Sequence, residues 1–302
     1  MASAAFAGGD CRFPKTKPVS IKNDMGPCKF DPDLLRFAGD PAQQAACLLT
    51  PVEKFGKLGS ARDNLPDALA RFVGTSTGLP DREGRRRLLQ ELQARGLDKD
   101  FGTGLDQPVA FAQKDDFTAR SATYFVIHDT SSPNYLSRPW PSDIDSDKSI
   151  NNLDRYACAN KIERAHVFIN RTGEVMLAHD LDVAWRATKF EMAIEFGSAL
   201  RGLFLHTELI QPRRREPGRG WANDFQAPSP GFSAAQYDAL ALIYTVASTR
   251  AGLWMIPAFH AVIDEGIWDK HDDPQNFDLA AFADSLEKLR ARLQPASTAQ
   301  SN

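Results

Sequence analysis

Runs of apolar residues in the second half of the chain predict a buried β-sheet. Residues 124–127 are Tyr, Phe, Val and Ile in succession, and His128 and polar residues follow, which is typical of a buried strand that ends at the histidine. Residues 203–210 predict another strand, with Glu208 inside the apolar run. A carboxylate is costly to bury without a partner, so Glu208 either faces solvent or is held for a purpose. Two more strands, joined as a hairpin, are predicted at residues 165–170 and 174–178.

Three segments carry the signals of helices. Ser233 and Gln236 form the Ser-x-x-Gln pattern of a capping box, and apolar residues then recur at helical spacing until Gly252. The other two helices are predicted at residues 81–95 and 279–293. Because strands alternate with helices, the sequence predicts an α/β or α+β layer fold with a mostly buried sheet.

The first part of the chain differs in composition from the rest. Residues 1–75 are rich in Pro, Gly and Cys, which predicts short helices separated by breakers. All six histidines follow residue 127. We therefore expect residues 1–110 to be a mainly helical accessory region, and residues 111–295 to be the domain that carries the chemistry.

Length and charge exclude some classes of protein. The chain has 302 residues, 42% of them apolar, which is enough for a large core and for one or two domains. A net charge of −3 without a basic block argues against nucleic acid as a partner. The sequence contains no apolar run of about 18 residues, so we predict no transmembrane segment.

The cysteines and the first residues bear on location. The segment MASAAFAGGDC lacks a basic region and is not an intact signal peptide, although it could be the remainder of one. The four cysteines are Cys11, Cys28, Cys47 and Cys158, and none forms a Cys-x-x-Cys pair. Their even number permits disulfides, which predict a periplasmic or secreted protein, and free buried thiols are the alternative. The sequence does not fix the pairing, and Cys28–Cys47 is the favoured pair.

The segment at residues 257–277 is the strongest candidate for a functional site. It contains His260, His271 and five acidic residues, and it ends shortly after an Asp-Asp-Pro sequence. Two histidines and several carboxylates at loop-like spacing are typical of a metal site or an acid–base site. We expect this segment to meet a histidine from far upstream in the sequence.

Several motifs, in order, resemble those of the zinc-dependent N-acetylmuramoyl-L-alanine amidases, which include the peptidoglycan-recognition proteins. The resemblance covers roughly residues 115–290. It implies an α/β fold with a central mixed β-sheet flanked by helices. The motifs are VIHDTS at His128, the hairpin AHVFINRTGEV, AWRA, the strand LHTEL, the helix start FSAAQ, and the run from His260 through Gly266 to Asp273-Pro274.

The resemblance implies a Zn²⁺ cofactor held by His128, His260 and Asp273. A catalytic zinc ion has three protein ligands and one position for water, whose pKa it lowers towards neutrality. Glu208 is the candidate base that takes the proton of this water. His271 is the candidate that stabilises the oxyanion of the tetrahedral intermediate, if it is protonated. The bond cleaved would be the amide between N-acetylmuramic acid and L-alanine, in peptidoglycan or muropeptides.

The sequence departs from the family pattern in three places. Asp273 lies seven residues after Gly266 where the family has about four, so Asp272 is a rival ligand. His271 stands where the family often has Lys, and Arg186 stands where it has His. We expect the other histidines, His166, His179 and His206, to be structural rather than metal ligands.

Two alternative functions remain open at this point. One is a peptidoglycan-binding module of the same fold without catalytic activity. The other is a zinc amidase that acts on a different amide. Neither the oligomeric state nor the choice between a housekeeping enzyme and a toxin follows from the sequence.

Overall fold

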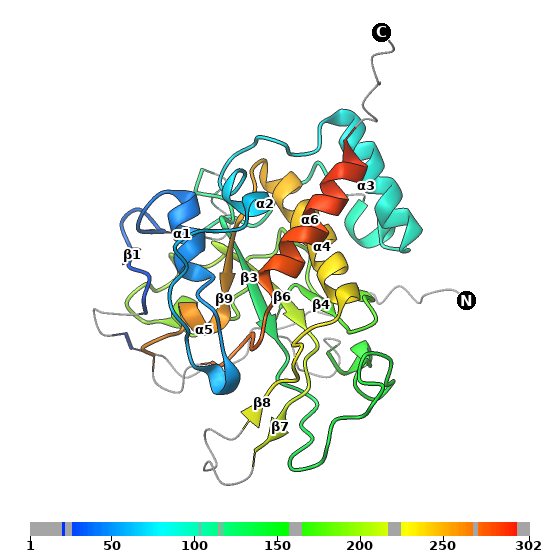
Figure 1. Cartoon of the computed structure of the whole chain (residues 1–302). Helices are drawn as coiled ribbons and strands as arrows, with labels where there is room; N and C mark the ends of the chain where they lie inside the picture. The colour runs from blue at the N-terminus through cyan, green and yellow to red at the C-terminus, as the bar shows by residue number, and fades with distance from the viewer. Residues whose placement is uncertain are drawn as a thin grey trace.

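A computed structural model describes most of the chain. It describes residues 20–294 apart from 22–25, 103, 114–115, 117, 157–164, 217–224 and 268–270. Cys11 and Cys158 lie outside the described residues. Figure 1 shows a central sheet with helices packed around it, which confirms the predicted α/β fold.

The central sheet is mixed and has five strands in the order β5-β4-β6-β3-β9. Only the β4–β5 hairpin is antiparallel, and the other neighbours are parallel. The four predicted strands are confirmed, each within a few residues of its predicted bounds. The five strands of the central sheet are β3 Tyr124–Asp129, β4 Val167–Ile169, β5 Val175–Leu177, β6 Phe204–Leu209 and β9 Ile256–Phe259.

The edge strand β9 was not among the predicted strands. Its apolar run is interrupted by Pro257, which has no N–H to donate to a neighbouring strand. Proline is tolerated there because β9 pairs on one side only, with β3. This strand carries the chain directly to His260.

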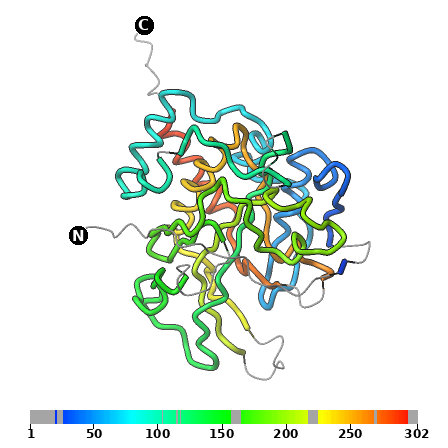
Figure 2. Tube along the Cα trace, turned by 180° about the vertical axis from the view of Figure 1, so that it is seen from behind, coloured from blue at the N-terminus to red at the C-terminus, as the bar shows by residue number. Residues whose placement is uncertain are grey.

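The two faces of the sheet have different coverings. α4 (Ala234–Ala251) packs on one face, where the ring of Tyr244 meets that of Phe125 at 5.3 Å. Side chains alternate between faces along a strand, so Tyr124 and His128 lie on the opposite face. Figure 2 shows that side, away from α4 and α6, where irregular chain covers the sheet.

The long helices begin and end where the capping signals predicted. Ser233 and Gln236 form the capping box of α4, and Gly252 ends it in the left-handed conformation. α4 lies beside α6 (Figure 1), and α3 packs against α6 in turn. The α-helices of the described residues are α1 Pro41–Leu48, α2 Asp67–Ala70, α3 Arg82–Ala94, α4 Ala234–Ala251, α5 His260–Ile263 and α6 Leu279–Leu293.

The expectation that residues 1–110 are mainly helical is wrong. In the described part of this range, α3 is the one helix longer than eight residues, and most residues lie in turns, bends and extended chain. Proline and glycine keep the other helices to one or two turns. The short strands and single turns outside the central sheet are β1 Phe30–Asp31, β2 Arg36–Phe37, β7 Arg214–Arg215, β8 Phe225–Gln226, η1 Lys54–Gly56, η2 Asp98–Gly102, η3 Leu153–Tyr156 and η5 Phe190–Met192.

The N-terminal segment is packed onto the sheet. α1 contacts β9. The hydroxyl of Tyr124 in β3 donates to Gln44 Oε1 (2.7 Å) and accepts from the backbone N–H of Phe37 (2.9 Å). Most buried apolar side chains from Cys28 to Leu293 belong to one core cluster, and a smaller cluster includes Ile150 and Tyr156. Residues far apart in the sequence therefore depend on the same core for stability.

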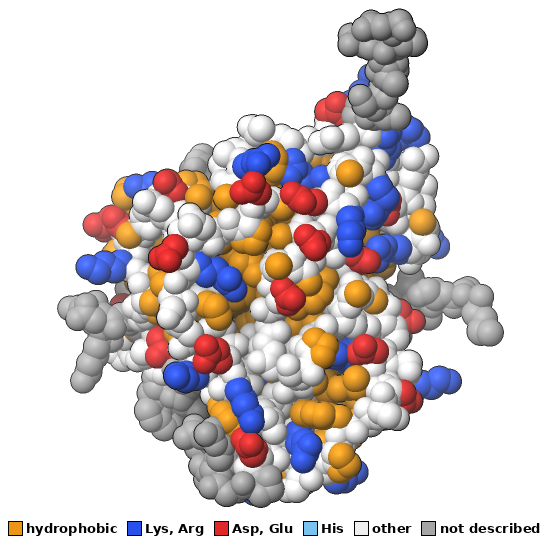
Figure 3. Space-filling view, in the orientation of Figure 1, with side chains coloured by type: hydrophobic (Ala, Val, Ile, Leu, Met, Phe, Trp, Pro, Cys, Tyr) orange, Lys and Arg blue, Asp and Glu red, His pale blue; other side chains and the backbone are white. Residues whose placement is uncertain are grey.

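The described helices include no candidate membrane span, and the face seen in Figure 3 does not carry charge of a single sign. None of the helices in the described ranges is long and apolar enough to cross a bilayer. Acidic and basic side chains are interspersed on the face seen in Figure 3. This distribution agrees with the mild net charge.

A disulfide joins Cys28 to Cys47, as the sequence favoured. We expect replacement of both cysteines by Ala to lower the free energy of unfolding by about 3 kcal/mol. The reason is that the bridge closes a loop in the unfolded chain, and the effect depends on the length of that loop. The two residues are 19 apart. Urea denaturation of the double variant beside the parent checks this, with an untreated and a reduced parent sample as references. An unchanged midpoint would contradict it.

Candidate metal centre

The register of the sheet places two histidines side by side. Ile127 in β3 pairs with Phe259 in β9, and the strands are parallel. His128 and His260 are the next residues along each strand, so both lie at the same edge of the sheet. His260 also begins the short helix α5. Both rings are buried, with 1% and 3% of the residue surface exposed.

Three ligand atoms converge at this edge, from His128, His260 and Asp273. The two Nδ1 atoms are 2.8 Å apart, and Asp273 Oδ2 lies 3.2 Å from His260 Nδ1 and 3.7 Å from His128 Nδ1. A triangle with these sides has a point about 2 Å from all three corners, which is the length of a bond from zinc to nitrogen or oxygen. The group could therefore hold a metal ion.

The charge states of the three side chains favour a cation between them. Burial and the neighbouring His260 lower the pKa of His128 well below its usual value, so this ring is neutral and offers a lone pair. Burial alone would lower the pKa of His260, but Asp273 and Asp264 outweigh it and raise this pKa well above its usual value. Without a metal, a proton on His260 supplies the positive charge, and a metal ion that binds must displace it.

The structure distinguishes between the two candidate aspartates. The Asp273 carboxylate is buried and also accepts the backbone N–H of Asp129 at 3.1 Å. The Asp272 side chain is 38% exposed, and its Oδ2 accepts from Gln275 at 2.7 Å. Its other oxygen lies 3.4 Å from Arg213. Asp273, as predicted, is the aspartate that meets the two histidines.

This difference predicts that substitutions at the two neighbouring aspartates affect zinc affinity differently. Asp273→Asn is expected to weaken zinc binding by about 100-fold, because one of three ligands then lacks its charge. Asp272→Asn changes the same chemical group next to it and is expected to leave zinc affinity nearly unchanged. Titration of the metal-free variants against a chromophoric chelator measures both. Equal losses in the two variants would contradict the assignment of Asp273.

Glu208 lies on the same face of the sheet as the two histidines. It pairs with His128 across β3 and β6, and paired residues of parallel strands point to the same side. It is 4% exposed, so the predicted carboxylate inside an apolar run is buried and does not face solvent. Its place beside the candidate metal centre suits a base.

His271 lies on the outer side of His260. The two rings stack with centroids 4.1 Å apart, and His271 Nδ1 is 3.6 Å from Asp273 Oδ1. Its side chain is 39% exposed, far more than those of the three converging residues. Partial burial and the charge of His260 lower the pKa of His271 to about 4. A pKa of about 4 favours the neutral ring at neutral pH, and a neutral imidazole can still donate an N–H.

Sequence reasoning missed Asp264, which supports His260. Asp264 Oδ2 lies 3.0 Å from His260 Nε2. It also accepts a backbone N–H from Lys189, and its other oxygen accepts one from Phe190. With Nε2 protonated, the His260 ring turns the Nδ1 lone pair towards Asp273. The His-x-x-x-Asp spacing, which puts both residues on one helical turn, was the available signal.

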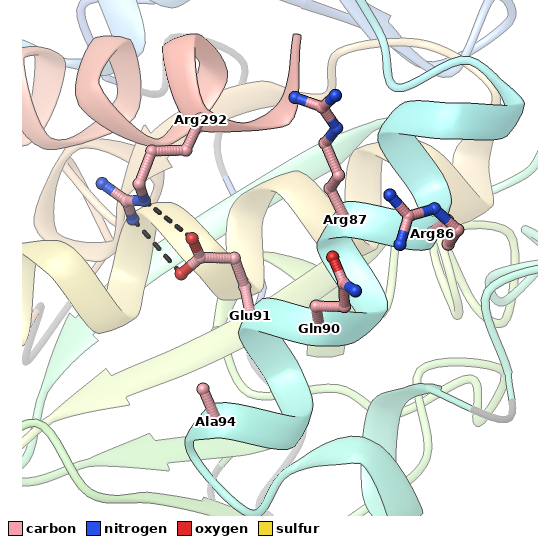
Figure 4. A pocket seen from close by; sticks show the side chains of 6 residues that line it. All are labelled: Arg86, Arg87, Gln90, Glu91, Ala94 and Arg292. Carbon is pink, nitrogen blue, oxygen red and sulfur yellow. Dashed lines mark hydrogen bonds and ion pairs between the residues drawn. The ribbon is translucent and has the colours of Figure 1, made fainter. Parts of the chain in front are cut away.

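The remaining histidines are buried around the centre. His166 stacks on His206 with centroids 5.7 Å apart, and His179 stacks on Trp185 at 4.0 Å. None of these three histidines is in a ligand group within the described residues. A surface hollow lies between α3 and α6, and neither helix contributes a residue to the centre (Figure 4). The hollow is lined by Arg86, Arg87, Gln90, Glu91, Ala94 and Arg292.

No protein-family model, curated protein or solved structure matches this chain. Any proposal of function therefore rests on the residues of the chain and on the order of its motifs.

Proposed function

We propose that this protein is a zinc-dependent amidase that cleaves the bond between N-acetylmuramic acid and L-alanine. The observation that carries the proposal is the convergence of His128, His260 and Asp273 on one point. The motif order that resembles the N-acetylmuramoyl-L-alanine amidases supports the choice of bond. The buried Glu208 on the same face supports a hydrolase over a binding module.

The residues fit zinc better than a harder cation. Two imidazole nitrogens and one carboxylate are typical of catalytic zinc sites, whereas Mg²⁺ and Ca²⁺ prefer oxygen ligands alone. A zinc ion held there would supply Lewis acidity and lower the pKa of a water molecule. Asp264 supports the fit, because it fixes the ring of His260 with Nδ1 facing the other two ligands.

The side chains of the protein divide the proton transfers of amide hydrolysis between them. Glu208 takes a proton from the attacking water as its oxygen bonds to the carbonyl carbon. The N–H of His271 donates a hydrogen bond to the carbonyl oxygen as negative charge develops there. The carbon–nitrogen bond then breaks, and Glu208 returns the proton to the nitrogen of L-alanine. The products are a free lactyl carboxylate and a free peptide amine.

Peptidoglycan or a soluble muropeptide is the proposed substrate, and the periplasm or the cell exterior is the proposed location. The disulfide between Cys28 and Cys47 supports this location, because disulfides persist in oxidising compartments. The same compartments contain peptidoglycan.

The test is digestion of purified sacculi and of soluble muropeptides by the protein, with and without a chelator, followed by mass analysis of the fragments. Free stem peptides that begin with L-alanine, released only without chelator, are the expected result. Zinc binding without any release would indicate a binding module. Release of other amines from a panel of peptides and small amides, but not from muropeptides, would indicate a different amide as the substrate.

A further inference from the structure

A chain of buried side chains leads from His128 away from the candidate metal centre. His128 Nε2 lies 3.1 Å from His206 Nδ1, and His206 Nε2 lies 3.1 Å from Glu191 Oε2. His206 and Glu191 are 0% exposed. The positions of the ring protons along this chain are therefore set by the neighbouring side chains and not by bulk water.

Only one arrangement of protons along this chain leaves His128 free to bind a metal. A neutral imidazole has one N–H and one lone pair. If Nδ1 of His128 offers its lone pair to a metal ion, its Nε2 carries the proton and donates to His206 Nδ1. His206 then carries its own proton on Nε2, which faces Glu191. A carboxylate can only accept, so Glu191 favours this tautomer of His206 over the other.

The surroundings fix both members of the chain in place. Glu191 Oε2 accepts from the hydroxyl of Thr188 (2.9 Å) and from the backbone N–H groups of Thr188 (3.1 Å) and Ala187 (3.2 Å), which hold the carboxylate in position. The backbone N–H of His206 donates to His166 Nδ1 at 3.1 Å, and the two rings stack. The three contacts to Oε2 restrain the Glu191 carboxylate, and the stacking on His166 restrains the His206 ring.

The same geometry is poorly suited to stability alone. Among the described residues, Glu191 Oε1 is buried without a hydrogen-bond partner, and His206 Nε2 lies close to Oε2 without forming a well-aligned hydrogen bond. A buried carboxylate with an unsatisfied oxygen is destabilising. Glu191→Gln keeps the shape and one acceptor oxygen for the Thr188 contacts, so it should fold at least as well as the parent. It removes the negative charge that favours a proton on the facing nitrogen of His206.

We infer that His206 and Glu191 are positioning residues that hold His128 in the tautomer with a free Nδ1 lone pair. The inference rests on the metal site of the proposed function. Asp264 does the same for His260 directly, whereas Glu191 acts on His128 through an intervening histidine. Groups that orient a ligand in this way typically change metal affinity by about 10- to 100-fold when they are replaced.

The first test measures zinc affinity and not activity. Metal-free Glu191→Gln and His206→Gln proteins are titrated with Zn²⁺ against a chromophoric chelator, and each should bind about 10- to 100-fold more weakly than the parent. His179→Gln is the matched control, because this buried histidine stacks on Trp185 and is not one of the contacts that link His128 to Glu191. It should keep the parent affinity. Parent-like affinity in folded Glu191→Gln and His206→Gln proteins would overturn the inference.

The second test reads the tautomers directly and needs no variant to fold. Nitrogen NMR of histidine-labelled protein, loaded with Zn²⁺, should show His206 protonated on Nε2 and His128 unprotonated on Nδ1. Protonation of His206 on Nδ1 would overturn the inference. Weaker zinc binding in the variants of a protein that cleaves no amide would support it while refuting the proposed function. An active amidase with unchanged zinc affinity in both variants would support the proposed function and overturn this inference.

Discussion

His128→Ala is expected to abolish both zinc binding and amide hydrolysis. Structural zinc sites bind their ion with about 10–16 kcal/mol, which is about 3 kcal/mol for each of their ligands. Removing one ligand should therefore weaken zinc binding at least about 100-fold. Hydrolysis should fall further, below detection, because the acidified water is lost with the metal. Metal analysis of the dialysed protein and fragment analysis of digested muropeptides measure the two losses separately.

The control for His128→Ala is a buried histidine that does not meet the metal centre. His179→Gln removes such a ring and should leave zinc content and turnover near those of the parent. Undiminished hydrolysis in His128→Ala would rule out the proposed site, since the other group in the described ranges that could hold a metal ion, His260, Asp264 and His271, is a different site.

Glu208→Gln is expected to separate metal binding from chemistry. The side chain keeps its size, and the three ligand atoms are untouched, so zinc affinity should match that of the parent. The rate of hydrolysis at saturating substrate should fall by about 100- to 10,000-fold, the usual contribution of a general acid–base group. Steady-state kinetics on a soluble muropeptide, with zinc content measured on the same sample, is the appropriate measurement.

Two results for Glu208→Gln would contradict its role. Full activity would show that another group takes the proton of the water. Loss of zinc together with activity would show that Glu208 supports the metal site and not the proton transfer. His271→Gln is a useful companion, since it removes a neighbouring group of different proposed role and should slow hydrolysis while zinc stays bound.

Much of the fold follows from local patterns in the sequence. The succession of apolar residues before His128 and the capping box at Ser233 each specify an element with little help from distant residues. The N-terminal region shows the limit of such patterns. Proline and glycine correctly predicted short helices there, but not that the residues between them would pack as turns against the sheet. Pro257 similarly concealed the edge strand β9.

The site could be predicted only in part, because its residues are far apart in the sequence. His128 and His260 are 132 residues apart and meet through the parallel pairing of β3 with β9, which no local pattern specifies. The order of the motifs supplied that pairing by resemblance. Spacing alone could not separate Asp272 from Asp273, because the direction of each side chain depends on the fold of the loop before Pro274.

The supporting residues were the hardest to predict. Glu191 lies in the single helical turn η5, a few residues after the AWRA motif, and no local pattern indicates that it meets His206 of β6. His206 was expected to be structural, although it shares a strand face with Glu208 at alternate positions. Asp264 alone had a local signal, its helical spacing from His260.

The most direct test of the central claim is the position of zinc in crystals of the loaded protein. An anomalous difference map calculated at the zinc absorption edge should contain one strong peak about 2 Å from His128 Nδ1, His260 Nδ1 and an Asp273 carboxylate oxygen. A zinc peak bound by other residues, or no peak in crystals grown with excess zinc, would contradict the claim that these three side chains form a metal centre.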